Sequence, residues 1–151
     1  VSSEVSELVN KAVREFKRQS GERVEVWILQ EQPVYIIVNP LEFELVIINL
    51  LRNAAQALQE LGVLNSKVAL TIKREDNKAL IAIEDNGHIE KEKIEKLSEP
   101  TNSTKADGLG LGLQIVRSII ENHGGKIFFS RAASGGLRVE IRLPAEETTE
   151  Q

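Results

Sequence analysis

Single helices alternate with pairs of short strands along this chain, and this order constrains its fold more than any other feature of the sequence. Apolar residues spaced three and four apart predict three main amphipathic helices, at 3–19, 40–61 and 111–120. Alternating or β-branched runs predict six strands, at 23–29, 34–38, 67–73, 79–85, 126–131 and 137–143. We therefore predict an α+β fold, a two-layer α/β sandwich in which the helices cover one face of a mixed sheet of about five or more strands.

The segment between the second pair of strands and the last helix differs from the rest of the chain. Residues 90–97 predict one or two helical turns, and residues 98–108 include almost no large apolar side chain. Long polar loops in compact domains are typically functional, so we predict a mobile lid or binding loop at about 90–108. The acidic tail at 145–151 is expected to be disordered. A single domain with its core at about 3–144 follows.

Composition narrows the class of protein. The 151 residues suit one domain, and a formal net charge of -4 argues against a nucleic-acid partner. The absence of cysteine excludes disulfides, thiolate metal sites and thiol catalysis. No apolar run approaches the ~20 residues of a membrane-spanning helix, and no signal-peptide pattern opens the chain. Because the chain begins at Val1 rather than methionine, we expect a piece of a longer protein that can carry a membrane segment elsewhere.

Two asparagines on the predicted helix at 40–61 are the first candidates for chemistry. Asn49 and Asn53 are four residues apart, which places both on one helix face at the edge of the apolar stripe. A side-chain amide oxygen at that edge suits a hard cation such as Mg²⁺. The alternative is a pair of solvated asparagines, which is the commoner environment for this residue type.

The second candidate is the Asp-Asn-Gly sequence at 85–87, where a predicted strand ends. Period-two geometry places Asp85 on the same side of its strand as the two preceding isoleucines, where a carboxylate at an apolar edge needs a partner. The exocyclic amine of adenine is one such partner, and Gly87 allows the backbone to approach a flat base. Alternatively, the three residues only reverse the chain. We interpret the adjacent His88 as an exposed loop residue.

The third candidate is the glycine run at 108–113 (GLGLGL), which leads directly into the last predicted helix. Glycine at every second position frees backbone N–H groups to face an anion, and a helix start adds a positive dipole end. The run has neither the Rossmann spacing nor the Gly-Lys-Ser/Thr of a P-loop, and its leucines are unlike a flexible linker. Hydroxyls and a cation that suit phosphates stand just upstream, at Ser103, Thr104 and Lys105.

Taken in order, these segments resemble the N box and the two glycine boxes of the GHKL ATPases. The boxes correspond to 49–58 (NLLRNAAQAL), 85–87 (DNG) and 108–113 (GLGLGL). The likeness is greatest to the catalytic, ATP-binding domain of sensor histidine kinases and extends from about residue 40 to residue 144. It includes Glu99-Pro100, His123-Gly124-Gly125 and the closing Leu143-Pro144. Three ordered boxes at the family's spacing are a specific signal.

The resemblance implies a Bergerat-type fold with an ATP lid, and ATP and Mg²⁺ as cofactors. It implies transfer of the γ-phosphoryl group to a histidine on a separate dimerisation domain, with a response regulator as a further partner in two-component signalling. The implied catalytic residues are Asn49, Asn53 and Lys105, with Asn53 as the metal ligand. The implied cofactor-binding residues are Asp85, Gly87, Ser103, Thr104, Gly108, Leu109, Gly110, Leu111, Gly112 and Leu113. A cytoplasmic location is expected, without membrane contact by this fragment but with a parent that can be membrane-attached.

The residue type at position 49 distinguishes the branches of this family. In the hydrolytic relatives, which are the gyrase, Hsp90 and mismatch-repair type ATPases, a glutamate stands at this position and orients the attacking water. An amide is a poor general base, so Asn49 favours phosphoryl transfer over hydrolysis. An autonomous GHKL ATPase and a nucleotide-binding switch or docking module without catalysis are the alternative hypotheses.

The chain departs from the family pattern at three places. Ile89 replaces the second glycine of the first glycine box, which predicts a stiffer or differently shaped base of the lid. Thr101 and Asn102 replace the usual paired phenylalanines of the lid. Gln56 replaces a common lysine, which leaves two candidate cations for the phosphates, Lys105 and Arg52. We therefore expect a modest affinity for nucleotide.

Overall fold

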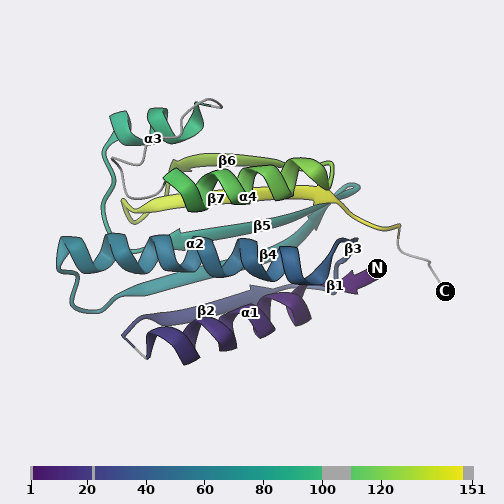
Figure 1. Cartoon of the computed structure of the whole chain (residues 1–151), viewed down its shortest axis with the longest axis horizontal. Helices are drawn as coiled ribbons and strands as arrows, with labels where there is room; N and C mark the ends of the chain where they lie inside the picture. Colours follow the sequence, from purple (N-terminus) through teal and green to yellow (C-terminus); the bar gives the residue numbers. More distant parts are fainter. Residues whose placement is uncertain (1, 22, 100–109, 148–151) are drawn as a thin grey trace.

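The computed structural model describes residues 2–21, 23–99 and 110–147 (Figure 1). Its helices are α1 (Val5–Ser20), α2 (Pro40–Leu61), α3 (Lys91–Ser98) and α4 (Gly110–Asn122). Its strands are β1 (Ser2–Glu4), β2 (Glu25–Gln30), β3 (Tyr35–Ile37), β4 (Lys67–Glu75), β5 (Lys78–Asp85), β6 (Lys126–Arg131) and β7 (Leu137–Pro144). The helices and strands predicted from periodicity are confirmed. Strand β1 was not predicted, because its three residues are too few to show a pattern.

Five strands form one mixed sheet in the order β2-β4-β5-β7-β6. Strand β2 is parallel to β4, and the remaining neighbours in this sheet are antiparallel. The predicted mixed sheet is therefore confirmed. Strand β3 follows β2 in the chain but pairs with β1 in a separate two-stranded sheet, in which Ser2 lies opposite Ile37.

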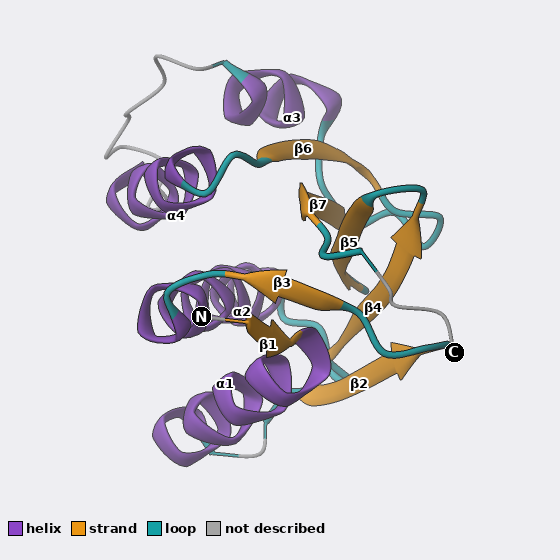
Figure 2. Cartoon of the chain, turned by 90° about the vertical axis from the view of Figure 1, so that its right-hand side faces the viewer, coloured by secondary structure: helices purple, strands orange, loops and turns teal. Residues whose placement is uncertain are grey.

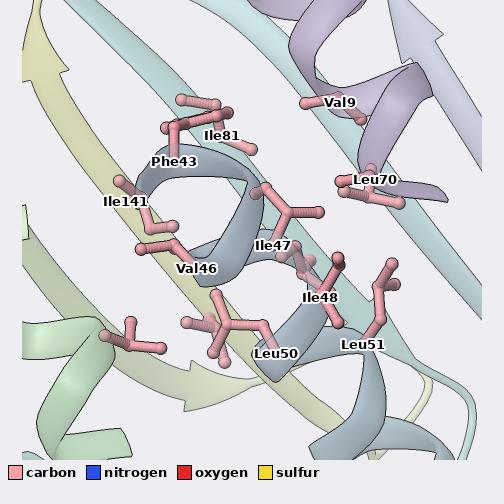
Figure 3. Close-up of a cluster of buried hydrophobic side chains, with 14 of the residues drawn as sticks. Val9, Phe43, Val46, Ile47, Ile48, Leu50, Leu51, Leu70, Ile81 and Ile141 are labelled. Atoms are coloured by element: carbon pink, nitrogen blue, oxygen red, sulfur yellow. The ribbon is translucent and has the colours of Figure 1, made fainter. Parts of the chain in front are cut away.

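Helices α1, α2 and α4 cover one face of the five-stranded sheet, which confirms the predicted two-layer arrangement (Figures 1 and 2). Helix α2 is central, with α1 on one side and α4 on the other. Its apolar side chains lie in one buried cluster with side chains of the sheet, as Figure 3 shows for Phe43, Ile47, Leu51, Leu70 and Ile81. Burial of this face fixes the rotation of α2 about its axis and thereby the direction of its polar edge.

Local signals set both ends of α2. Asn39 precedes the helix and its side-chain oxygen accepts a hydrogen bond from the backbone N–H of Glu42 at 3.0 Å, while Pro40 occupies the first turn, as predicted. Gly62 ends the helix in the left-handed conformation with φ of 72° and donates to the carbonyls of Gln59 and Leu58. The positions of Asn49 and Asn53 along this helix follow from these two ends.

The segments after β5 and β7 complete the described chain. Helix α3 contacts β6, apart from the row formed by α1, α2 and α4 (Figure 2). The start of the tail is ordered, contrary to our expectation, because Ala145 donates to the Asn77 carbonyl at 2.9 Å and Glu146 donates to the Tyr35 carbonyl at 2.8 Å. In the described residues, no helix has the length and apolar character needed to span a membrane.

Candidate functional site

A cavity of about 290 Å³ lies between α2, the end of β5, β6, β7, α3 and the start of α4. This volume is at the lower end of the range for small-molecule pockets. Most of its wall is apolar, formed by Leu50, Ile83, Ile89, Leu113, Leu137 and Val139. Asn53 enters from α2 and Asp85 from β5, and charged or titratable side chains form the rim, at Glu60, His88, Glu90 and Lys93. An apolar cavity with few polar groups inside is typical of a small-molecule or cofactor site.

Asp85 is the polar group that most distinguishes this cavity. Its side chain is on the same face of β5 as Ile83, as predicted, and the residue is 7% exposed, which makes it the only buried charged residue in the described ranges. Burial raises the pKa of the Asp85 carboxyl, and backbone hydrogen bonds from Gly87 and Leu137 partly oppose that rise. The Gly87 N–H lies 2.9 Å from Oδ1. A carboxylate accepts more than two hydrogen bonds, so Asp85 retains acceptor capacity toward the cavity.

The turn between β6 and β7 contacts Asp85. Ser134 Oγ donates to the Asp85 carbonyl at 3.2 Å, and the Gly136 backbone lies so close that a Cβ there would overlap Asp85. Two further hydrogen bonds attach the turn to Ile89, whose N–H donates to the Gly135 carbonyl and whose carbonyl accepts from Arg131, both at 3.0 Å. The sequence Ser134-Gly135-Gly136 by itself indicates only a hairpin turn. Within it, only the two consecutive glycines indicate that another part of the backbone can come close.

The residues at 85–87 reverse the chain and also place a carboxylate at the cavity, so features of both sequence interpretations are present. Asn86 has a purely structural part, since its Oδ1 accepts from the Lys67 N–H at 2.8 Å and its Nδ2 donates to the Asn65 carbonyl at 2.7 Å. Gly87 lies against Leu58 of α2, where a Cβ would be 3.0 Å from Cδ2. The chain reversal therefore presses the end of β5 against α2, while the Asp85 carboxylate stays available to the cavity.

The two asparagines of α2 are both half-buried. Asn53 lines the cavity together with Asp85, so the structure brings these two predicted residues to one site. Asn49 lies one turn away, beside the start of α4, where a Cβ on Gly112 would be 3.6 Å from its Oδ1. Their roles toward a metal or nucleotide stay predictions.

The described part of the glycine run, at 110–113, forms the first turn of α4, which begins at Gly110. Leu113 is buried and lines the cavity, and Gly112 adjoins Asn49. Gly110 and Leu111 form the first residues of the helix backbone. The remaining predicted contacts to phosphate lie outside the described residues, namely Ser103, Thr104, Lys105, Gly108 and Leu109.

Several positions differ from the sequence-based interpretation. Arg52 does not line the cavity and donates to Gln19 of α1, an arrangement that gives no support to its predicted role as a phosphate cation. Lys93 of α3 is a cation at the rim that the sequence did not reveal, because nothing in the local pattern relates α3 to α2. His88 is exposed, as interpreted, but its Nε2 has a partner in Glu90 at 2.9 Å.

His123, which follows α4, does not line the cavity, and its ring forms hydrogen bonds elsewhere. Its Nδ1 lies 2.8 Å from the Ile119 carbonyl, and its Nε2 accepts from the Asn39 N–H at 3.2 Å. The ring thus joins the end of α4 to the start of α2, and both nitrogens are occupied.

A model of the family described as histidine kinase-, DNA gyrase B- and HSP90-like ATPases matches residues 38–147. The match covers more than half of the chain, so the chain belongs to this ATPase family. Among curated proteins, the sensor protein TdiS of Thauera aromatica is 38% identical over 109 residues, covering 69% of this chain and 20% of that protein. Sporulation kinase B of Bacillus subtilis (strain 168) is 38% identical over 101 residues, covering 66% of this chain and 23% of that protein.

Solved structures agree with this assignment. The catalytic domain of histidine kinase ThkA superposes with a TM-score of 0.79 at 26% identity, covering 95% of each chain. The mycobacterial sensor histidine kinase MprB superposes with a TM-score of 0.78 at 20% identity, covering 98% of this chain and 100% of that chain, which supports the fold alone. The expectation of a sensor histidine kinase catalytic domain of the GHKL type is confirmed. The chain spans about a fifth of the length of the curated relatives named above.

Proposed function

We propose that this chain binds Mg-ATP in the cavity beside Asp85 and transfers the γ-phosphoryl group to a histidine on a separate helical dimerisation domain of the same kinase. The buried Asp85 carboxylate at the end of an apolar cavity is the observation that carries this proposal. A response regulator would then receive the phosphoryl group from that histidine. The relatives are sensor proteins and kinases several times longer than this chain, which supports the presence of partner domains. The proposal includes a cytoplasmic site of action in a parent that can be membrane-attached.

Adenine fits the cavity for reasons of shape and polarity. Its ring would contact the apolar wall, and its exocyclic amine would donate to the Asp85 carboxylate. Guanine carries an acceptor oxygen where adenine carries this amine, so it would place two acceptors against each other. Burial raises the pKa of Asp85. The same burial would make it energetically costly for the carboxylate to lose its hydrogen-bond donor.

Asn53 would hold Mg²⁺ through its amide oxygen. The described ranges include no group of three or more histidine, aspartate or glutamate side chains that could hold a metal. Mg²⁺ commonly keeps several waters and binds mainly through substrate phosphates, with one or two protein ligands. When bound, Mg²⁺ would neutralise phosphate charge. Asn49, one turn before Asn53, offers no general base, which favours transfer over hydrolysis.

Substitution Asp85→Asn should weaken ATP binding by about 1–3 kcal/mol, which is roughly a 5- to 150-fold rise in Kd, because a donor replaces an acceptor in a buried position. Isothermal titration with ATP and GTP measures this. Glu84→Gln is the matched control, since Glu84 is the adjacent acid on β5 but pairs with Arg138 at 2.6 Å outside the cavity. Equal ATP and GTP affinities in the parent chain, or the same loss in both variants, would contradict the adenine assignment.

Substitution Asn53→Ala should lower the Mg²⁺-dependent part of ATP affinity by at least about tenfold and leave binding in chelator nearly unchanged, because only a metal ligand is removed. The comparison requires ATP titrations with Mg²⁺ and with EDTA. Gln59→Ala is the control, because Gln59 is exposed on the same helix and does not line the cavity. A parallel fall of both affinities in Asn53→Ala would show that the residue is structural.

A further inference from the structure

Helix α3 forms the outer wall of the cavity and is held there by contacts with other elements. Lys93 and Leu97 line the cavity, and Leu97, at 3% exposure, is the only buried residue of this helix. The preceding Glu90 supplies no side-chain cap to the first turn. An eight-residue helix is not stable alone in water, so the position of α3 depends on tertiary contacts.

Arg117 of α4 supplies such a contact at the end of α3. Its Nη2 donates to the Leu97 carbonyl at 2.8 Å. This carbonyl belongs to the last turn of α3, whose carbonyls lack partners within the helix, and a cationic donor also suits the negative end of the helix dipole. The bond therefore ties α3 to α4 at the carbonyl of the residue that packs into the cavity wall.

The same guanidinium also contacts a side chain of β6 that lines the cavity. Its Cζ lies 5.7 Å from the centre of the Phe129 ring on β6, within the range of a cation–π interaction, and Phe129 lines the cavity. Arg117 itself does not line the cavity and is half-buried. No ion pair found among the described residues includes Arg117.

We propose that Arg117 is a positioning residue that holds α3 as the outer wall of the nucleotide cavity, by joining the Leu97 carbonyl to the Phe129 ring. This inference rests on the proposed function. Without the tie, α3 would occupy its docked position for only part of the time. The apparent Kd of a ligand rises in inverse proportion to the population of the competent state, so affinity would fall although Arg117 does not touch the ligand.

Substitution Arg117→Met, which keeps the apolar stem, should raise the Kd for Mg-ATP by about tenfold, as expected if the docked population falls to roughly a tenth. Hydrogen exchange of the α3 amides in the empty protein should accelerate by at least about tenfold, because the undocked population would rise from a small minority to most of the molecules. Arg117→Lys, which retains a cationic donor, should recover part of both effects. Phe129→Leu, which keeps an apolar wall but removes the ring, should give an intermediate loss.

The matched control is Arg142→Met. Arg142 makes the same kind of contact, with its Cζ 5.2 Å from the Phe128 ring, but Phe128 does not line the cavity. This variant should leave the Kd for Mg-ATP and the exchange of α3 unchanged. Wild-type affinity in Arg117→Met, or unchanged exchange of its α3 amides, would overturn the inference.

Failure of the proposed function would look different from failure of this inference. If the parent chain did not bind Mg-ATP, the proposed function would fall, and the exchange of α3 in Arg117→Met would still decide whether this residue holds the helix. If the parent chain bound Mg-ATP and Arg117→Met bound it equally well, only the role of Arg117 would be lost.

Discussion

Radiolabelled ATP should leave no stable phosphate on this chain when the chain is incubated alone, and should label a histidine-bearing helical hairpin of the same kinase once that hairpin is added. Phosphoryl transfer depends mainly on holding the acceptor in line with the γ-phosphate. The chain has two histidines. His88 lines the proposed adenine cavity and pairs with Glu90, and His123 joins α4 to α2 through both ring nitrogens. Since His88 lies at the proposed adenine end of the site and both ring nitrogens of His123 are engaged, we expect neither histidine to act as an in-line acceptor.

The label on the hairpin should be acid-labile and base-stable, as phosphohistidine is, and hydrolysis by the chain alone should be very slow because Asn49 is no general base. A hairpin with glutamine in place of its acceptor histidine controls for specificity. The Asp85→Asn chain should support less labelling at limiting ATP. Label on this chain alone, or brisk hydrolysis that the hairpin does not change, would favour an autonomous ATPase instead.

Substitution Gly136→Ala should lower the free energy of unfolding by about 3 kcal/mol and weaken ATP binding, because the added Cβ would overlap the backbone oxygen and Oδ1 of Asp85. Relief requires the β6–β7 turn or the end of β5 to move, and either movement displaces the carboxylate. Urea unfolding followed by circular dichroism gives the stability, and titration gives the affinity.

Gly62→Ala is the comparison for this variant. Gly62 has φ of 72°, and a Cβ at this residue would have no other group within 4 Å, so the substitution adds only the cost of a left-handed alanine, about 1–2 kcal/mol. ATP affinity should be unchanged. If Gly136→Ala were no more destabilising than Gly62→Ala and bound ATP normally, the turn would not position Asp85.

The sequence predicted every helix and every strand except β1, and it singled out Asn53 and Asp85, which the structure brings to one cavity. The length and ends of α2 follow from its apolar spacing, from Asn39 and Pro40 at the start and from Gly62 at the end, all of which act within a few residues. Period-two geometry correctly placed Asp85 on the buried face of β5. These features are local, because a helix or strand reveals its buried face within its own segment.

Other features exist only because the folded chain brings distant residues together. Ser134 and Asp85 are 49 residues apart, and the close approach of their segments makes the β6–β7 turn a support for the carboxylate. Arg52 and Asn53 are neighbours in sequence, but the rotation of α2 turns one toward α1 and the other into the cavity. The departure of β3 from the main sheet and the tie between Arg117 and α3 likewise depend on which elements become neighbours. Local propensity carries no information on such pairings, because burial against a particular partner, rather than the segment itself, determines their free energy.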